Sequence, residues 1–225
     1  MNTGKRTYAN PCGVARGLDV IGERWALLVV RDLLLGPKRF NDLLAGLPGV
    51  SPNVLSQRLR ELVDQGVVRK RDLGAPTRVR LYELSEWGAE LEPLLLELGR
   101  WGSRAPAEPQ GLLGIDSLIL GVKAGFDPAR SVALEGVYEL DIDDDTYVAK
   151  VADGRIEVAR VAAAGPVDAA FAADLATMRA VCEGVITVAE AVESGAARST
   201  GTTDAQQRLA DLLWRSAAAA PSRLP

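Results

Sequence analysis

The stretch SPNVLSQRLREL, residues 51–62, has the pattern of a helix with two unlike faces. Ser51 is suited to cap the first turn and Pro52 to the first helical position, so a helix is predicted to begin here. Leu55, Leu59 and Leu62 recur at helical spacing and form an apolar stripe for burial. A second face carries side chains that donate to and accept from base edges in a DNA major groove, namely Asn53, Ser56, Gln57 and Arg60. The stretch therefore predicts the recognition helix of a DNA-binding domain.

The segments on either side of this helix predict a winged helix-turn-helix. A short helix over 38–45 and a turn over 46–50 precede it, and Gly66 is expected to end it. Two strands, 67–71 and 78–84, follow with a loop between them. A basic hairpin directly after a recognition helix is a wing, whose arginines reach phosphates or the minor groove. The alternative is that these arginines only keep the hairpin hydrated. The predicted DNA contacts beyond the polar helix face are Lys38, Arg39, Ser51, Arg69, Arg71, Arg78 and Arg80.

Three further helices are expected in this half of the chain. One covers 13–21, a second covers 24–35 and is apolar nearly all round, and a third over 85–102 carries a long apolar stripe. Pro93 is expected to bend the third helix or delay its start, because proline removes a backbone hydrogen bond. A small domain offers little core for so long a stripe, which predicts a dimer interface; packing on its own domain is the alternative. The stripe consists of Trp87, Leu91, Leu94, Leu95, Leu98 and Trp101.

The composition is that of a globular protein and argues against several kinds of enzyme. Of the 225 residues, 48 % are hydrophobic and 25 % are charged. The chain has no histidine, which excludes Ser-His-Asp nucleophiles, histidine-ligated zinc and histidine phosphorelays. It also lacks a glycine-rich phosphate loop, and its two cysteines cannot form a four-cysteine metal site. We therefore expect no enzymatic activity, no cofactor and no metal.

Charge is divided unevenly between the two halves of the chain. Residues 1–104 hold 16 Lys or Arg against 12 Asp or Glu, whereas residues 105–225 hold 10 against 18. The first half is thus basic, as contacts to DNA phosphates require, and the acidic second half is expected to face away from DNA. No apolar run reaches the roughly 18 residues that span a bilayer, and the first residues lack a signal-peptide pattern. We expect a cytoplasmic protein.

The second half predicts a separate α+β domain. Residues 105–111 are the clearest linker, so we expect domains at 1–104 and 112–225 and a chain that is mostly α with an α+β C-terminal part. The expected elements of the second domain are a helix over 112–126, strands over 136–142, 147–151 and 155–161 with a tight turn at 153–154, helices over 167–182 and 188–194, a strand over 198–201 and a final helix over 204–219.

The first half resembles the HxlR-type regulators, a group related to MarR. The resemblance covers about residues 11–104 and is carried by residues 12–25, 31–40 and 55–62. It implies a homodimeric bacterial transcription factor that binds a pseudo-palindromic site. It also implies one recognition helix in each half-site, with the half-sites about one turn of DNA apart.

The same resemblance gives Cys12 a candidate role. Many members of the family carry a cysteine at this position, and in some of them it senses oxidants or electrophiles. A sensing thiol needs exposure and a lowered pKa, and Arg16, one helical turn on, favours a thiolate. The alternative is that Cys12 only fills space beside the first helix. Cys182 lies in an apolar helical pattern and is expected in the core.

The second half resembles a sterol-carrier-protein-like fold over about residues 112–216. The resemblance is carried by residues 187–195 and the small strand that follows them. It implies a hydrophobic tunnel for a fatty acyl, sterol or polyketide-like ligand, lined by Phe171, Leu175, Met178 and Trp214, although each of these also suits a plain core. The leading hypothesis is a regulator controlled by such a ligand. The alternatives are a regulator switched by Cys12 and a lipid-binding module whose DNA binding is vestigial.

Overall fold

The chain divides into two compact units. The computed structural model describes residues 7–74, 79–106, 111 and 113–218. The units comprise residues 1–95 and 96–225, so the division falls inside helix α6 (Glu92–Gly102), upstream of the linker predicted over 105–111. Within the described ranges, no helix is both long enough and apolar enough to cross a membrane.

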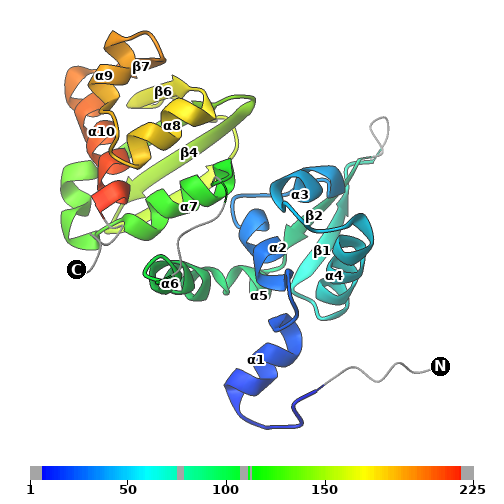
Figure 1. Cartoon of the computed structure of the whole chain (residues 1–225). Coiled ribbons are helices and arrows are strands. Elements are labelled where there is room, and N and C mark those ends of the chain that lie inside the picture. The colour runs from blue at the N-terminus through cyan, green and yellow to red at the C-terminus, as the bar shows by residue number, and fades with distance from the viewer. Residues whose placement is uncertain (1–6, 75–78, 107–110, 112, 219–225) are drawn as a thin grey trace. The chain divides into compact units, whose positions relative to one another are not determined.

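The first unit contains the helices and the hairpin expected of a winged helix-turn-helix (Figure 1). Its elements are α1 (Gly13–Ile21), α2 (Ala26–Leu33), α3 (Phe40–Gly46), α4 (Pro52–Asp64), β1 (Val68–Asp72), β2 (Arg80–Leu84) and α5 (Glu86–Ala89). The strands β1 and β2 pair antiparallel and form the predicted hairpin. The winged helix-turn-helix prediction is confirmed for this unit.

The apolar stripe of α4 fixes this helix in the core of the first unit. Leu55, Leu59 and Leu62 are at most 1 % exposed and belong to one apolar cluster with Val29 and Val30 of α2. Complete burial of one such side chain contributes about 1.5–3 kcal/mol. Since the stripe is buried, the opposite side of α4 is directed to solvent.

The two ends of α4 are set by the residues that the sequence singles out. The hydroxyl of Ser51 accepts a hydrogen bond from the backbone N–H of Val54 at 3.4 Å, and Pro52 is the first helical residue. Beyond the other end, Gly66 has a φ of +77°, a conformation that favours glycine. The chain can therefore leave the helix sharply and enter β1.

The long helix predicted over 85–102 is broken into α5 and α6. Pro93 is the second residue of α6, where its missing N–H costs no helical hydrogen bond. The delayed start that proline predicts is thus confirmed, and Glu90 and Leu91 form the turn between the helices.

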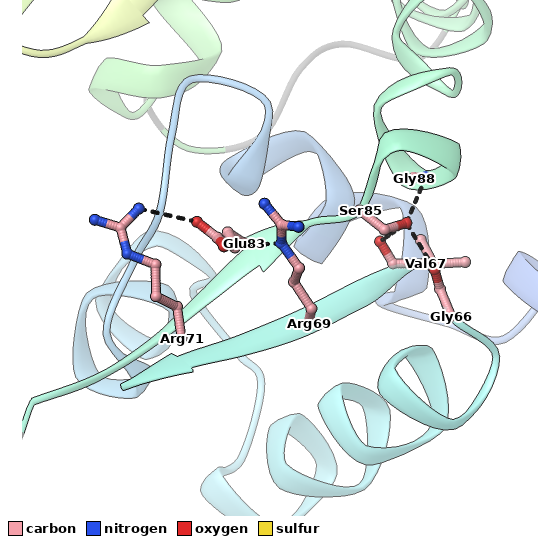
Figure 2. A network of polar contacts seen from close by, with 7 residues as sticks. All are labelled: Gly66, Val67, Arg69, Arg71, Glu83, Ser85 and Gly88. Atoms are coloured by element: carbon pink, nitrogen blue, oxygen red, sulfur yellow. Dashed lines mark hydrogen bonds and ion pairs between the residues drawn. The ribbon is translucent and has the colours of Figure 1, made fainter. Parts of the chain in front are cut away.

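A short polar network attaches α5 to the hairpin (Figure 2). The hydroxyl of Ser85 accepts a hydrogen bond from the N–H of Gly88 at 2.9 Å and donates one to the carbonyl of Gly66 at 2.6 Å. A Cβ atom on Gly88 would lie 2.1 Å from the carbonyl oxygen of Val67, so only glycine fits here. This contact fixes where α5 begins relative to the hairpin.

The second unit is an α+β fold around one mixed sheet. In addition to the end of α6, its elements are α7 (Ile115–Gly125), η1 (Pro128–Leu134), β3 (Gly136–Ile142), β4 (Asp145–Ala152), β5 (Arg155–Arg160), β6 (Ala169–Ala173), α8 (Leu175–Cys182), α9 (Val188–Glu193), β7 (Ala197–Gly201) and α10 (Thr203–Ala218). The strand order is β5-β4-β3-β6-β7, and only the β3–β6 pair is parallel. Helices α7, α8 and α10 lie over the sheet (Figure 1).

The helix predicted over 167–182 is wrong in its first half. Those residues form β6, which lies inside the sheet between β3 and β7. Alanine is a strong helix former and the sequence AAFAA shows no polar alternation, so local pattern does not reveal a strand. Strand pairing on both sides overrides that preference. The helix α8 begins only after Asp174, whose carboxylate accepts a hydrogen bond from the N–H of Thr177 at 2.7 Å.

Candidate nucleic-acid interface

The polar face of α4 is exposed to solvent. Asn53, Ser56, Gln57 and Arg60 are all exposed, on the side of the helix away from its buried leucines. The amide of Gln57 donates a hydrogen bond to Glu61 at 3.0 Å, which holds its side chain along the helix. The set combines donors and acceptors of the kinds that read base edges, so this face is chemically able to contact a major groove.

The first arginine of α4 has a structural role that the sequence pattern did not reveal. Arg58 is only 7 % exposed, and its guanidinium forms an ion pair with Glu61 and lies 3.6 Å from a carboxylate oxygen of Glu23. It therefore ties α4 to the segment just before α2. Arg60, two positions further, is exposed. Helical spacing separates the two arginines, because residues two apart lie on different faces.

The wing carries arginines that are paired with carboxylates. Arg69 donates from Nε to Glu83 at 2.8 Å, and Arg71 donates from Nη1 to the other carboxylate oxygen of Glu83 at 3.2 Å (Figure 2). Arg80 donates to Asp72 at 3.1 Å. The three arginines are exposed but not unpaired, and the predicted contact Arg78 lies outside the described residues.

Lys38 is not part of the surface that DNA can reach. It is only 4 % exposed, and its backbone exchanges two hydrogen bonds with Tyr82, of 2.9 and 2.8 Å, that add a bridge to β2. The prediction of a DNA contact is corrected here, because pairing with a distant strand draws this lysine inward. The neighbouring Arg39 is exposed before α3, and Ser51 is exposed at the start of α4.

The apolar stripe of α5 and α6 is largely uncovered. Trp87, Leu94, Leu98 and Trp101 are 40–68 % exposed, whereas Leu91 and Leu95 pack partly against the core of the first unit. A second uncovered apolar patch lies on α1, where Val14 is 72 % and Leu18 is 43 % exposed.

The two cysteines have opposite environments. Cys12 is exposed directly before α1, and the nearby backbone N–H groups of Ala15 and Val14 in the first turn of that helix lower the pKa of its thiol. Cys182 is buried, and burial raises the pKa of its thiol to about 12. Only Cys12 has the exposure and the lowered pKa of a reactive thiol.

The residues predicted to line a tunnel lie in or beside the core of the second unit. Phe171 and Met178 have no exposed surface, and Leu175 is partly buried. The side chain of Trp214 lies outside the described residues. These positions fit the plain core that the sequence left open as the alternative. Among the described residues, no group of three or more acidic, cysteine or histidine side chains is arranged to hold a metal ion.

A buried polar group also lies in this unit. The hydroxyl of Tyr147 donates a hydrogen bond to Asp116 of α7 at 3.2 Å, and a guanidinium nitrogen of Arg160 lies 3.8 Å from the same carboxylate oxygen. Burial and the charge of Asp116 raise the pKa of Tyr147. The group joins α7 to β4 and β5.

Comparison with known proteins places the first half of the chain in a family. Residues 20–109 match the model of the HxlR-like helix-turn-helix family. The HTH-type transcriptional regulator YvaP of Bacillus subtilis is 43 % identical over 39 % of this chain and 82 % of its own length. YybR of the same organism, also an HTH-type transcriptional regulator, is 35 % identical over 45 % of this chain and 83 % of its own length. The oxidized form of the redox regulator HypR is 32 % identical, with a TM-score of 0.41, over 43 % of this chain and all of its own. The family match ends before the mixed sheet of the second unit, and through residues 20–109 the chain belongs to the HxlR-like helix-turn-helix family.

Proposed function

We propose that this protein is a dimeric transcriptional regulator that binds a pseudo-palindromic DNA site, with α4 of each copy in a major groove. The observation that carries the proposal is the exposed polar face of α4 formed by Asn53, Ser56, Gln57 and Arg60. Arg39 before α3 and the wing arginines Arg69, Arg71 and Arg80 flank this face as exposed phosphate contacts. The proposal includes no catalytic step.

Dimerisation is supported by apolar surface that one copy leaves uncovered. Trp87, Leu94, Leu98 and Trp101 are large, exposed and arranged along α5 and α6. Large apolar side chains exposed along neighbouring helices are typical of an interaction site, and aromatic residues are enriched in such interfaces. A second copy is the occupant that a two-fold symmetric DNA site requires.

The test is selection of the bound sequence from a pool of random duplexes by the full-length protein. The expected result is an inverted repeat with half-sites about 10–10.5 base pairs apart, bound by a species with twice the mass of the chain. Sedimentation of the free protein and of the complex measures that mass. If no sequence is enriched and affinity for duplex DNA does not fall with salt, the protein is better described as a lipid-binding module with vestigial DNA binding.

The signal that controls the regulator has two candidates. A hydrophobic ligand in the second unit is supported only by the resemblance of residues 187–195 to a sterol-carrier-like fold. A thiol switch at Cys12 is favoured by a specific observation, because this thiol is exposed and its pKa is lowered by backbone N–H groups of α1. Native mass spectrometry of the gently purified protein separates them. An added apolar mass supports a carried ligand, whereas a clean mass that gains oxygen or a disulfide under mild oxidant supports Cys12.

A further inference from the structure

We propose that Glu83 restrains Arg69 and Arg71 on the wing and so limits how strongly the protein binds DNA of arbitrary sequence. The inference rests on the proposed function, because it requires a wing that meets DNA. It assigns a role to one of the two acidic residues of a hairpin that is mostly basic.

The geometry of the hairpin brings the three side chains together on one face. In the antiparallel register, Arg69 is directly opposite Glu83, and Arg71 follows Arg69 on the same face of β1. This face is the reverse of the one on which Val68 and Leu84 pack into the core. The carboxylate of Glu83 lies between the two guanidinium groups (Figure 2).

The carboxylate is divided between the two arginines. Oε1 accepts from Arg69 at 2.8 Å, and Oε2 accepts from Arg71 at 3.2 Å. The side chain of Glu83 is 14 % exposed, whereas those of the arginines are 65 % and 52 % exposed. Solvent screens the charge of a partly buried carboxylate less than that of a fully exposed one. Glu83 therefore attracts both guanidinium groups more strongly than an exposed acid would.

A carboxylate and a phosphate compete for the same guanidinium donors. Both accept charge-assisted hydrogen bonds from arginine with similar geometry. Glu83 therefore occupies donors that would bind the DNA backbone, and it reduces the charge of the three side chains from +2 to +1. Phosphate contacts supply most of the sequence-independent affinity for DNA. Glu83 thus weakens this part of the binding without touching the base-reading face of α4.

The other acidic residue of the wing provides a matched control. Asp72 accepts from Arg80 at 3.1 Å, but their side chains are 66 % and 60 % exposed. A pair so fully hydrated holds its arginine weakly. Asp72→Asn and Glu83→Gln each remove one negative charge from the same hairpin. They differ in the partners of the acid, which are two arginines for Glu83 and one exposed arginine for Asp72.

The experiment measures binding of full-length protein to a fluorescent duplex of mixed sequence between about 50 and 200 mM salt, a range over which affinity that comes from phosphate contacts falls steeply. Glu83→Gln is expected to bind about fivefold tighter or more at the low-salt end, with a log–log salt slope steeper by up to ~1.8, because each added phosphate contact contributes about 0.9. Asp72→Asn is expected to steepen the slope by no more than ~0.9, since it affects one arginine.

The dependence on the two arginines is tested in a second background. In a protein carrying Arg69→Gln and Arg71→Gln, adding Glu83→Gln should leave affinity and salt slope unchanged. Thermal unfolding of every variant confirms that the hairpin remains folded. If Glu83→Gln binds no tighter than Asp72→Asn, or tightens binding equally without the arginines, the proposal is overturned. If the unmodified protein shows no salt-dependent DNA binding at all, the proposed function falls and this inference with it; if it binds but Glu83→Gln has no effect, only the inference falls.

Discussion

The two arginines of α4 allow stability and DNA binding to be separated within one helix. Arg58 is 7 % exposed and ion-paired with Glu61, whereas Arg60 is exposed two residues later. We predict that Arg58→Ala lowers the free energy of unfolding and that Arg60→Ala lowers only the affinity for the selected DNA site. The pair is matched in residue type, helix and change of charge.

The magnitude for Arg58 follows from what its side chain contacts. Alanine lacks the Cγ and Cδ methylenes of this side chain, and burial of these two contributes up to ~1.6 kcal/mol at about 0.8 kcal/mol each. The ion pairs add at most about 1 kcal/mol, since Glu61 and Glu23 are 38 % and 61 % exposed and hydrate when the arginine is removed. Ordering a long side chain opposes these gains by up to ~2 kcal/mol, which leaves a net loss of about 1 kcal/mol.

Thermal unfolding followed by circular dichroism measures this loss. A domain of this size loses roughly 4–8 °C in Tm for each kcal/mol, so Arg58→Ala should unfold at least ~4 °C lower. Arg58→Met keeps most of the apolar stem and should recover part of the difference. Arg60→Ala should stay within about 0.5 kcal/mol of the unmodified protein, as is usual for exposed positions.

Binding to the selected duplex is then measured well below the lowest Tm. Arg60→Ala should lose about 1–3 kcal/mol of affinity if Arg60 reads a base, whereas folded Arg58→Ala should bind nearly normally. The reasoning is refuted if Arg60→Ala is as unstable as Arg58→Ala, or if it binds the selected site without loss.

Three further changes test other parts of the structure. A thiol reagent should label Cys12 but not Cys182 in the native protein at neutral pH, because a lowered pKa and exposure favour reaction and burial prevents it; mass spectrometry of the labelled peptides identifies the site. Gly88→Ala should cost about 1–3 kcal/mol in thermal unfolding, because a Cβ 2.1 Å from the carbonyl of Val67 forces the helix and hairpin apart. The pKa of Tyr147 is raised, so the folded state keeps its proton when the unfolded chain begins to lose it near pH 10; stability should fall as pH rises above that value, and less steeply in Tyr147→Phe.

Features that depend on local pattern could be predicted from the sequence. The cap at Ser51, the buried stripe of α4 and the exposed polar face all follow from spacing within one helix. The delayed start of α6 follows in the same way, because the effect of Pro93 on backbone hydrogen bonding is local. These features carry the candidate DNA interface.

Features that depend on pairing between segments distant in sequence could not be predicted from local pattern. The sequence predicts Lys38 as a surface lysine at the start of a short helix, but its backbone pairs with Tyr82, which is distant in sequence, and the side chain is buried. The alanine-rich segment of β6 becomes a strand because β3 and β7 pair with it. The carboxylate that holds Arg69 and Arg71 comes from the opposite strand, so their restraint depends on the register of the hairpin. In each case the deciding partner is remote in the chain.

The apolar stripes of α4 and of α5 and α6 show how far periodicity alone can go. Leu55 and Leu59 lie four residues apart and are at most 1 % exposed, whereas Leu94 and Leu98, at the same spacing, are 50 % and 40 % exposed. The spacing predicts that a helix has an apolar face, but it does not predict what packs against that face. That depends on how much of the domain core is still open to the helix. The core of the first unit is already filled by α4 and α2, and it accepts only the near side of α6 at Leu95. Because several large apolar side chains exposed along neighbouring helices are typical of an interaction surface, the uncovered side is the strongest structural reason to look for a second copy.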